Sequence, residues 1–175
     1  FYRLPHISTR SAFKRVLDTV GALVGLGILA VIFVPIAIAI RLDSQGPILY
    51  SQERFGLQGK PFTIWKFRSM VTDADELKAS IANEWNVLLG DMSLVGTRPP
   101  TGDEVAHYNE RHWKRLDVRP GMTGQWQVNG RSSVIDFEDI VTLDLDYQQQ
   151  WTPVYDVQLL VKTVAVLLSK KAGAC

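Results

Sequence analysis

The residues in this chain best suited to chemistry are arginines and lysines, one in a loop that contains glycines and two on a predicted strand. The loop from Gly90 to Pro100 is punctuated by glycine, and Arg98 stands directly before its two closing prolines. Such a loop can direct backbone N–H groups and a guanidinium at phosphate oxygens. Upstream, side-chain alternation places Lys66 and Arg68 on one face of a predicted strand. Two cations on one strand face predict either a site for a phosphorylated ligand or an ordinary solvated face.

Two adjacent acidic pairs, Asp75-Glu76 and Asp103-Glu104, could supply catalytic carboxylates, but the sequence assigns that role to neither. The first pair follows Thr72, a predicted N-cap, and acids in the first turn of a helix are stabilised by the helix dipole. That placement favours a structural role for the first pair.

A membrane element must position these groups, and the uncharged stretch Thr19–Ile40 is suited to that role. About 22 residues of helix cross roughly 30 Å of hydrocarbon. Pro35 removes a backbone donor, so the helix is expected to kink or break near Val34. Lysines and arginines flank both ends of the stretch, which predicts that both ends are cytoplasmic. A helix over residues 14–42 that enters the membrane, breaks and returns satisfies both flanks, and a Pro-kinked single span is the alternative.

Two local features of this helix predict contacts. Asp18 follows Lys14 and Arg15 at helical spacing, which predicts an ion pair with one of them. Gly21 and Gly25 form a small-xxx-small pair that allows another helix to approach closely.

The rest of the chain predicts a small mixed α/β domain. Two strands, residues 48–52 and 62–70, are separated by glycines and predict a β-hairpin. Periodicity and capping residues predict four further helices: Thr72 to Gly90, Asp103 to Leu116, one that begins near Phe137 behind an Asp136 cap, and residues 157–168. The last has an apolar face wider than a core stripe, so it is expected to lie in the membrane interface as an amphipathic helix.

Composition predicts a single domain over residues 1–175. The chain is 46% hydrophobic and has a net charge of +1, from 19 basic and 18 acidic residues. This balance gives no indication of nucleic acid binding, so any anion site must be local. The one cysteine, Cys175, excludes an internal disulfide framework and fits a reducing compartment.

The Gly90–Pro100 loop resembles the Gly-(Asp/Glu)-Met-Ser-Leu-Val-Gly-Pro-Arg-Pro signature of bacterial sugar transferases, the monotopic phosphoglycosyl transferases. Thr97 stands here in place of the usual proline. Further blocks match the family in the same order along nearly the whole chain: Lys14-Arg15 with Asp18, Gly46-Pro47, Gln52 to Gly56, Lys66 to Met70, and Arg119 to Arg131.

The resemblance implies transfer of a sugar 1-phosphate from a nucleotide diphosphate sugar to a polyprenyl phosphate, with Mg²⁺. This is the first membrane step of exopolysaccharide or glycoconjugate synthesis, at the cytoplasmic face of the bacterial inner membrane among membrane lipid. A homo-oligomer is compatible with it. The family uses a re-entrant helix broken at a proline, a role that falls to Pro35. The cations implied to neutralise the substrate phosphates are Lys66, Arg68, Arg98 and Arg131.

One departure from the family pattern concerns the catalytic residues. The family carries its nucleophile in a Ser/Thr-x-Asp-Glu-x-Pro-Gln motif shortly before the residues that match Trp85 to Leu88, and this chain lacks that motif between Glu84 and Trp85. Either the catalytic loop has been lost, or the sequence omits a segment at this junction; the agreement on both sides favours the second. A catalytically inactive membrane module that binds nucleotide sugar or polyprenyl phosphate is the alternative function.

Overall fold

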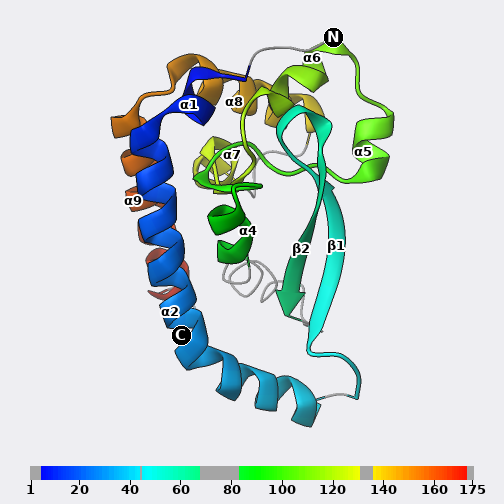
Figure 1. The fold of residues 1–175 in the computed structure, drawn as a ribbon, viewed down its shortest axis with the longest axis vertical. Coiled ribbons are helices and arrows are strands. Elements are labelled where there is room, and N and C mark those ends of the chain that lie inside the picture. Colours follow the sequence, from blue (N-terminus) through cyan, green and yellow to red (C-terminus); the bar gives the residue numbers. More distant parts are fainter. Residues whose placement is uncertain (1–4, 44, 68–82, 131–135, 173–175) are drawn as a thin grey trace.

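The structure is a computed structural model that describes residues 5–43, 45–67, 83–130 and 136–172, and every structural statement below concerns these residues. The helices and 3-10 turns, shown in Figure 1, are α1 (Ile7–Arg10), α2 (Ala12–Asp43), η1 (Leu57–Gly59), α4 (Glu84–Leu89), α5 (Gly102–Ala106), α6 (Glu110–Trp113), η2 (Lys114–Asp117), α7 (Gln125–Gly130), α8 (Phe137–Gln150) and α9 (Pro153–Ala172). The strands are β1 (Leu49–Phe55), β2 (Pro61–Phe67), β3 (Ser93–Val95) and β4 (Gly121–Thr123). The mixed helix and strand architecture with a hairpin confirms the predicted α/β class.

Helix α2 runs along one side of the molecule and turns in its C-terminal part toward the hairpin (Figure 1). Of the two outcomes expected near Val34, a kink or a break, the structure has a bend without a break, since the helix continues through Pro35 to Asp43. An internal proline removes one donor and bends a helix without having to end it. The bend is accompanied by a contact between the rings of Phe33 and Phe67, whose centroids lie 5.5 Å apart.

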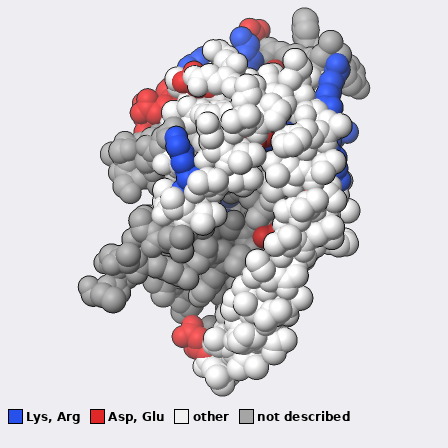
Figure 2. Space-filling model, turned by 90° about the vertical axis from the view of Figure 1, so that its left-hand side faces the viewer, with Lys and Arg blue, Asp and Glu red and all other residues white. Residues whose placement is uncertain are grey.

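The apolar surface of α2 is mostly uncovered. In the described part of the chain, α2 is the one helix long and apolar enough to cross a membrane, and 6% of its most apolar window is buried. Viewed from the side that carries α2, the described surface is predominantly uncharged (Figure 2). A soluble core helix would bury this surface, so the exposure indicates membrane association.

The start of α2 is fixed by a buried ammonium group. Lys14 Nζ donates to Asp156 Oδ2 at 2.6 Å, to the carbonyl of Val95 at 2.8 Å and to the hydroxyl of Tyr147 at 3.2 Å. Trp151 Nε1 donates to the same carboxylate oxygen. Lys14 therefore links α2 to β3, α8 and α9, and the prediction that it pairs with Asp18 is wrong.

The neighbouring charged residues of α2 also contact partners distant in sequence. Arg15 donates to the carbonyls of Val87 and Leu88, at the end of α4, at 2.7 and 2.6 Å. Asp18 Oδ1 accepts from Ser93 Oγ and from the Leu94 amide, both at 2.9 Å. The helical spacing predicted local pairs, but buried charges are better satisfied here by the backbone ends of α4 and β3.

The small-residue pair of α2 packs closely, as predicted, against the rest of the same chain. A Cβ at Gly21 would lie 2.4 Å from Leu94, and one at Gly25 would lie 2.6 Å from Glu84. These contacts place the first turn of α4 directly against α2.

The predicted hairpin is confirmed with different ends. β1 and β2 pair antiparallel from Leu49 opposite Phe67 to Phe55 opposite Pro61. Phe62 and Ile64 face the core as the alternation predicted, and Lys66 on that face is half-buried instead of solvated. The alternation places Phe67 on the opposite face, yet this residue is also buried, because it packs against the bent part of α2.

The second sheet is a short parallel pair. β3 and β4 align Ser93 with Gly121 and Val95 with Thr123. Val95 packs with Tyr147 and Leu159 in one core cluster, and Leu159 is fully buried. This pair carries the Arg98 loop at its C-terminal end.

Of the two middle helices, one lies largely outside the described residues and the other is divided. The helix expected from Thr72 to Gly90 is described only as α4, and its predicted end is confirmed because Gly90 adopts a φ of 92°. The helix expected from Asp103 to Leu116 consists of α5, α6 and η2, since Thr101 and Asn109 each form a capping box and begin a new helix.

The last two helices were predicted correctly. Asp136 caps α8 by accepting from the Glu138 amide. α9 leaves four valines, 41–65% exposed, on its surface: Val154, Val157, Val161 and Val164. Leu159, Tyr155 and Leu160 pack in the core, so the valines are the described part of the apolar stripe that does not face it.

Candidate anion-binding site

The predicted phosphate-binding cations are only partly brought together. Arg68 and Arg131 lie outside the described residues. On the hairpin, Lys66 lies opposite Tyr50. The Arg98 loop contacts the hairpin at Arg54, whose Nη1 donates to the carbonyl of Pro99 at 3.0 Å. Four residues of strand separate these two places by about 13 Å. The site is therefore built from Arg98, and Lys66 lies toward the other end of the hairpin.

Arg98 is held by an acid and an aromatic ring. Its Nη1 donates to Glu104 Oε1 at 2.9 Å, and its guanidinium carbon lies 5.7 Å from the centre of the Trp126 ring. Glu104 is itself fixed at the start of α5, because its other oxygen accepts from the Thr101 amide. The Arg98 side chain is 30% exposed, so an oriented guanidinium reaches solvent at this point.

Arg54 is a second guanidinium at the site, and the sequence reasoning did not select it. Burial and then the positive charge of Arg98 lower the pKa of Arg54, so the two cations are close enough to repel. Arg54 also donates to the side-chain oxygen of Gln52 at 2.8 Å, which fixes its orientation. Two guanidiniums at one loop give a local positive charge that favours anions. The available signal was strand alternation, which places Gln52 and Arg54 on one face of β1.

The acidic pairs do not form a catalytic dyad in the described residues. Asp75 and Glu76 lie outside them. Asp103 is an exposed residue in the first turn of α5, and Glu104 contacts Arg98 and caps the helix. Both residues of the second pair therefore have the structural role that first-turn acids usually have.

Glu84 is the acid nearest the junction with the missing family motif. It begins α4, packs against Gly25 of α2 and is 4% exposed. Burial raises the pKa of Glu84 to about 7. In the described residues its Oε2 atom has no hydrogen-bond partner. Glu84 is thus an acid in an apolar environment that favours its protonated form.

Magnesium binding stays a prediction from the resemblance. The described residues contain no group of three His, Cys, Asp or Glu side chains close enough to hold a metal ion. Magnesium prefers carboxylate and water oxygens in octahedral geometry. The acids described above are separated or already bonded to protein groups, so no step of the chemistry is assigned to a metal here.

A long uncovered apolar helix on a small α/β body indicates a membrane-associated protein, and Arg54 and Arg98 form its candidate anion site. The description "Bacterial sugar transferase" belongs to the family model that matches residues 9–84 and 80–170. The chain belongs to this bacterial sugar transferase family. The two parts of the match meet at residues 80–84, where the sequence lacks the expected acidic motif.

Curated relatives agree with the family match. A galactosyl transferase (CpsE) of Streptococcus agalactiae is 38% identical over 205 residues, covering 96% of this chain and 44% of the relative. An uncharacterized sugar transferase (EpsL) of Bacillus subtilis is 34% identical, covering 89% of this chain and 87% of the relative. The UDP-glucose:undecaprenyl-phosphate glucose-1-phosphate transferase of Escherichia coli is 33% identical, covering 93% of this chain and 42% of the relative.

The alignments add two facts about the extent of the chain. It spans less than half the length of the streptococcal and E. coli relatives. The alignment with the streptococcal relative is 205 positions long, which exceeds the 175 residues here, so that relative has residues with no counterpart in this chain.

Proposed function

We propose that this chain transfers a sugar 1-phosphate from a nucleotide diphosphate sugar to a polyprenyl phosphate, the first membrane step of a polysaccharide or glycoconjugate pathway. The observation that carries the proposal is that Arg54 and Arg98 meet at one loop of a chain with an exposed apolar helix, and that a relative of this chain is named for UDP-glucose and undecaprenyl phosphate. Guanidiniums neutralise a diphosphate, and the membrane helix brings the chain to a lipid-linked acceptor. The related enzymes act on different sugars by name, so the proposal is limited to the class of substrate.

The chemistry proposed is a covalent transfer. A carboxylate attacks the sugar-bearing phosphorus, a nucleoside monophosphate leaves, and an oxygen of the polyprenyl phosphate then attacks the same phosphorus and releases the carboxylate. Arg98 and Arg54 would hold the diphosphate, and Lys66, Arg68 and Arg131 stay predicted phosphate contacts. A magnesium requirement also stays a prediction, to be checked by adding Mg²⁺ or a chelator to the same assay.

An inactive binding module is the second candidate function. The observation that favours it is the break in the family match at residues 80–84, together with the absence of the acidic motif from the sequence there. Such a module would bind the nucleotide sugar through the arginines without turning it over.

The Arg98 side chain gives the direct test of ligand binding. Charge-assisted contacts contribute about 1.5–3 kcal/mol each, so Arg98→Ala is expected to weaken UDP-glucose binding at least roughly tenfold. Its ion pair with Glu104 is partly exposed, so the melting temperature should change little. Isothermal titration calorimetry of the purified chain in detergent measures the affinity. Arg111→Ala is the matched control, because Arg111 also pairs with a glutamate, Glu138, but on an exposed face. Equal affinity of the Arg98 variant and the parent would remove Arg98 from the site.

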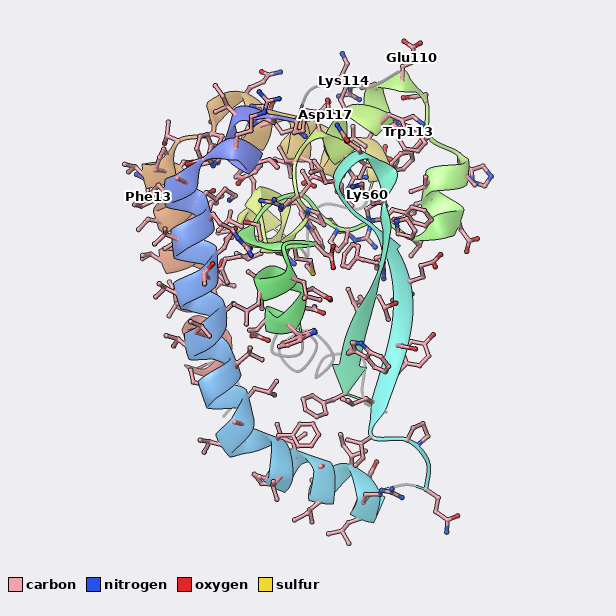
Figure 3. The ribbon with its side chains drawn as sticks, viewed as in Figure 1. Phe13, Lys60, Glu110, Trp113, Lys114 and Asp117 are labelled. Carbon is pink, nitrogen blue, oxygen red and sulfur yellow. The ribbon has the colours of Figure 1, made fainter. Side chains whose placement is uncertain are left out.

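The proposed location is the cytoplasmic face of the bacterial inner membrane, with α2 re-entrant and α9 in the interface. The bend of α2 and the four exposed valines of α9 support this arrangement. Figure 3 places Phe13, at the start of α2, and Lys60, at the hairpin tip, at the same end of the molecule as Glu110, Lys114 and Asp117. A charged end of this kind suits water, and the uncharged surface of α2 suits lipid.

Cysteine labelling tests the topology. In a variant that lacks Cys175, an impermeant thiol reagent is expected to modify Arg10→Cys and Lys60→Cys from the same side of inverted membrane vesicles. Replacing Pro35 with Leu is expected to favour a continuous span, because about 22 apolar residues suffice to cross the bilayer. The Pro35→Leu variant should then expose the two cysteines on opposite sides. Labelling of the two positions from opposite sides in the parent background would contradict the re-entrant arrangement.

A further inference from the structure

A fully buried ion pair lies beneath the candidate site. Arg115 and Asp144 side chains are each 1% exposed, and Arg115 Nη2 and Nε donate to Asp144 Oδ2 at 2.7 and 2.8 Å. The guanidinium also lies 5.4 Å from the centre of the Phe137 ring and donates to the Tyr108 hydroxyl at 2.8 Å. Burying such a pair costs much of the energy that the pair returns, so stability alone is a weak reason for its presence.

The contacts of this pair converge on the backbone of Arg98. Arg115 Nη2 donates to the carbonyl oxygen of Arg98 at 3.5 Å, the long limit of a hydrogen bond. The Arg98 amide is close enough to Asp144 to favour its charged form, although burial raises the pKa of Asp144 to about 6. In the described residues Asp144 Oδ1 has no hydrogen-bond partner. The backbone of Arg98 is therefore anchored on a buried pair while its guanidinium reaches solvent.

Thr97 adds a contact that the proline usual in the family signature cannot make. Its hydroxyl donates to the carbonyl oxygen of Arg115 at 3.2 Å, and the residue is 1% exposed. Its own carbonyl accepts from the Gly121 amide at 2.8 Å. Thr97 thus connects the chain segment of Arg115 to the residue directly before Arg98.

We propose that Arg115, Asp144 and Thr97 are positioning residues that fix Arg98 for a diphosphate. The inference rests on the proposed function, because it assigns these residues to the binding of the same ligand class. A guanidinium held in its binding geometry loses less conformational entropy when the anion arrives. None of the three residues has to touch the ligand, and their effect on affinity has to pass through Arg98.

A double-mutant cycle tests this dependence on Arg98. UDP-glucose affinity is measured by calorimetry for the full chain and for Asp144→Asn, Arg98→Ala and the combined variant, below the melting temperature of each. The expected result is a three- to tenfold loss from Asp144→Asn in the parent background and no further loss in the Arg98→Ala background. A purely structural role would give the same loss in both backgrounds, and that result would overturn the inference.

Thr97 provides a second test, because valine keeps the shape of threonine without its hydroxyl, whereas serine keeps the hydroxyl. Thr97→Val removes the hydroxyl and is expected to weaken UDP-glucose binding two- to fivefold, while Thr97→Ser retains the parent affinity. Thr163→Val is the matched control, since it removes a half-buried hydroxyl that bonds to the Leu159 carbonyl and to the Thr123 hydroxyl but not to the Arg115 segment, and it should leave the affinity unchanged. Equal affinities of Thr97→Val and Thr97→Ser would exclude Thr97. If Asp144→Asn does not fold, the Thr97 pair alone decides the inference.

The affinities of these variants distinguish an error in the positioning role from an error in the proposed function. If Arg98→Ala weakens binding but the Asp144 and Thr97 variants act independently of Arg98, only the positioning role is wrong. If Arg98→Ala leaves UDP-glucose binding unchanged, the candidate site and the positioning role are both wrong.

Discussion

Replacing Gly121 with Ala is expected to destabilise the protein by more than about 3 kcal/mol, a large share of the roughly 5–15 kcal/mol that holds a domain folded. A Cβ at this position would lie 2.1 Å from the amide nitrogen of Gly96, and a Cβ at Gly96 would lie 2.3 Å from the carbonyl oxygen of Arg119. Both clashes involve backbone, which cannot rotate away as a flexible side chain can. The β3–β4 pair would have to separate.

A third glycine lies where the backbones of β3 and β4 approach each other. A Cβ at Gly124 would lie 2.2 Å from the carbonyl oxygen of Gly96. Gly96→Ala and Gly124→Ala are therefore expected to behave like Gly121→Ala, with melting temperatures lower by roughly 10 °C or with no folded protein recovered. Circular dichroism of detergent-purified protein during heating gives the measurement.

Gly27→Ala is the matched control for these substitutions. A Cβ at Gly27 meets no atom within 4 Å, and the residue lies within helix α2. Alanine in a helix is more stable than glycine by up to about 1 kcal/mol, so this variant should melt at or slightly above the parent temperature. A Gly121→Ala protein as stable as the Gly27→Ala protein would show that the backbones of β3 and β4 do not approach as closely as described.

Local signals in the sequence were sufficient to predict where several helices and the hairpin begin or end. Asp136 predicted the start of α8, Gly90 predicted the end of α4, and alternation with glycines predicted the hairpin, because caps and turns depend on a few adjacent residues. The break between α5 and α6 was also visible locally, since Asn109 is a favoured N-cap residue and its side chain accepts from the His112 amide three residues later. It was missed because helical periodicity was followed across the cap.

Long-range contacts could not be predicted from spacing. Lys14 has Asp18 at a suitable helical distance, yet it pairs with Asp156 on the last helix. Arg54 and Arg98 are brought together only when the end of β1 meets the Arg98 loop. Lys66 and Arg98 were expected in one site, but the length of the hairpin separates them. Each outcome depends on how elements pack, which a one-dimensional pattern does not contain.

The junction of Glu84 and Trp85 decides whether the chain can perform the chemistry. A polypeptide in which these residues are directly bonded is expected to bind UDP-glucose but to release no nucleoside monophosphate. Covalent transfer needs a positioned carboxylate, and the resemblance places it in a motif that this sequence lacks. The family match breaks at the same place.

The acids that are present do not replace the missing nucleophile. Glu104 is bonded to Arg98 and to the Thr101 amide, so its oxygens are already used. Glu84 is 4% exposed and packs against Gly25 of α2, so its carboxyl group is not accessible to a substrate phosphorus. Asp75 and Glu76 follow a predicted N-cap some ten residues before the expected place.

The assay combines intact mass with turnover. Purified protein, with its mass and a peptide across Ser80 to Leu89 determined, is incubated with Mg²⁺, UDP-glucose, UDP-galactose and undecaprenyl phosphate, and release of uridine monophosphate is followed. Turnover by a chain whose mass confirms the direct bond would contradict the prediction. Loss of that turnover in Glu84→Gln or in Asp75→Asn would then identify the nucleophile. Turnover by a chain whose mass includes extra residues would instead place the nucleophile in the additional segment, because the resemblance assigns the nucleophile to a motif that this sequence lacks at the junction.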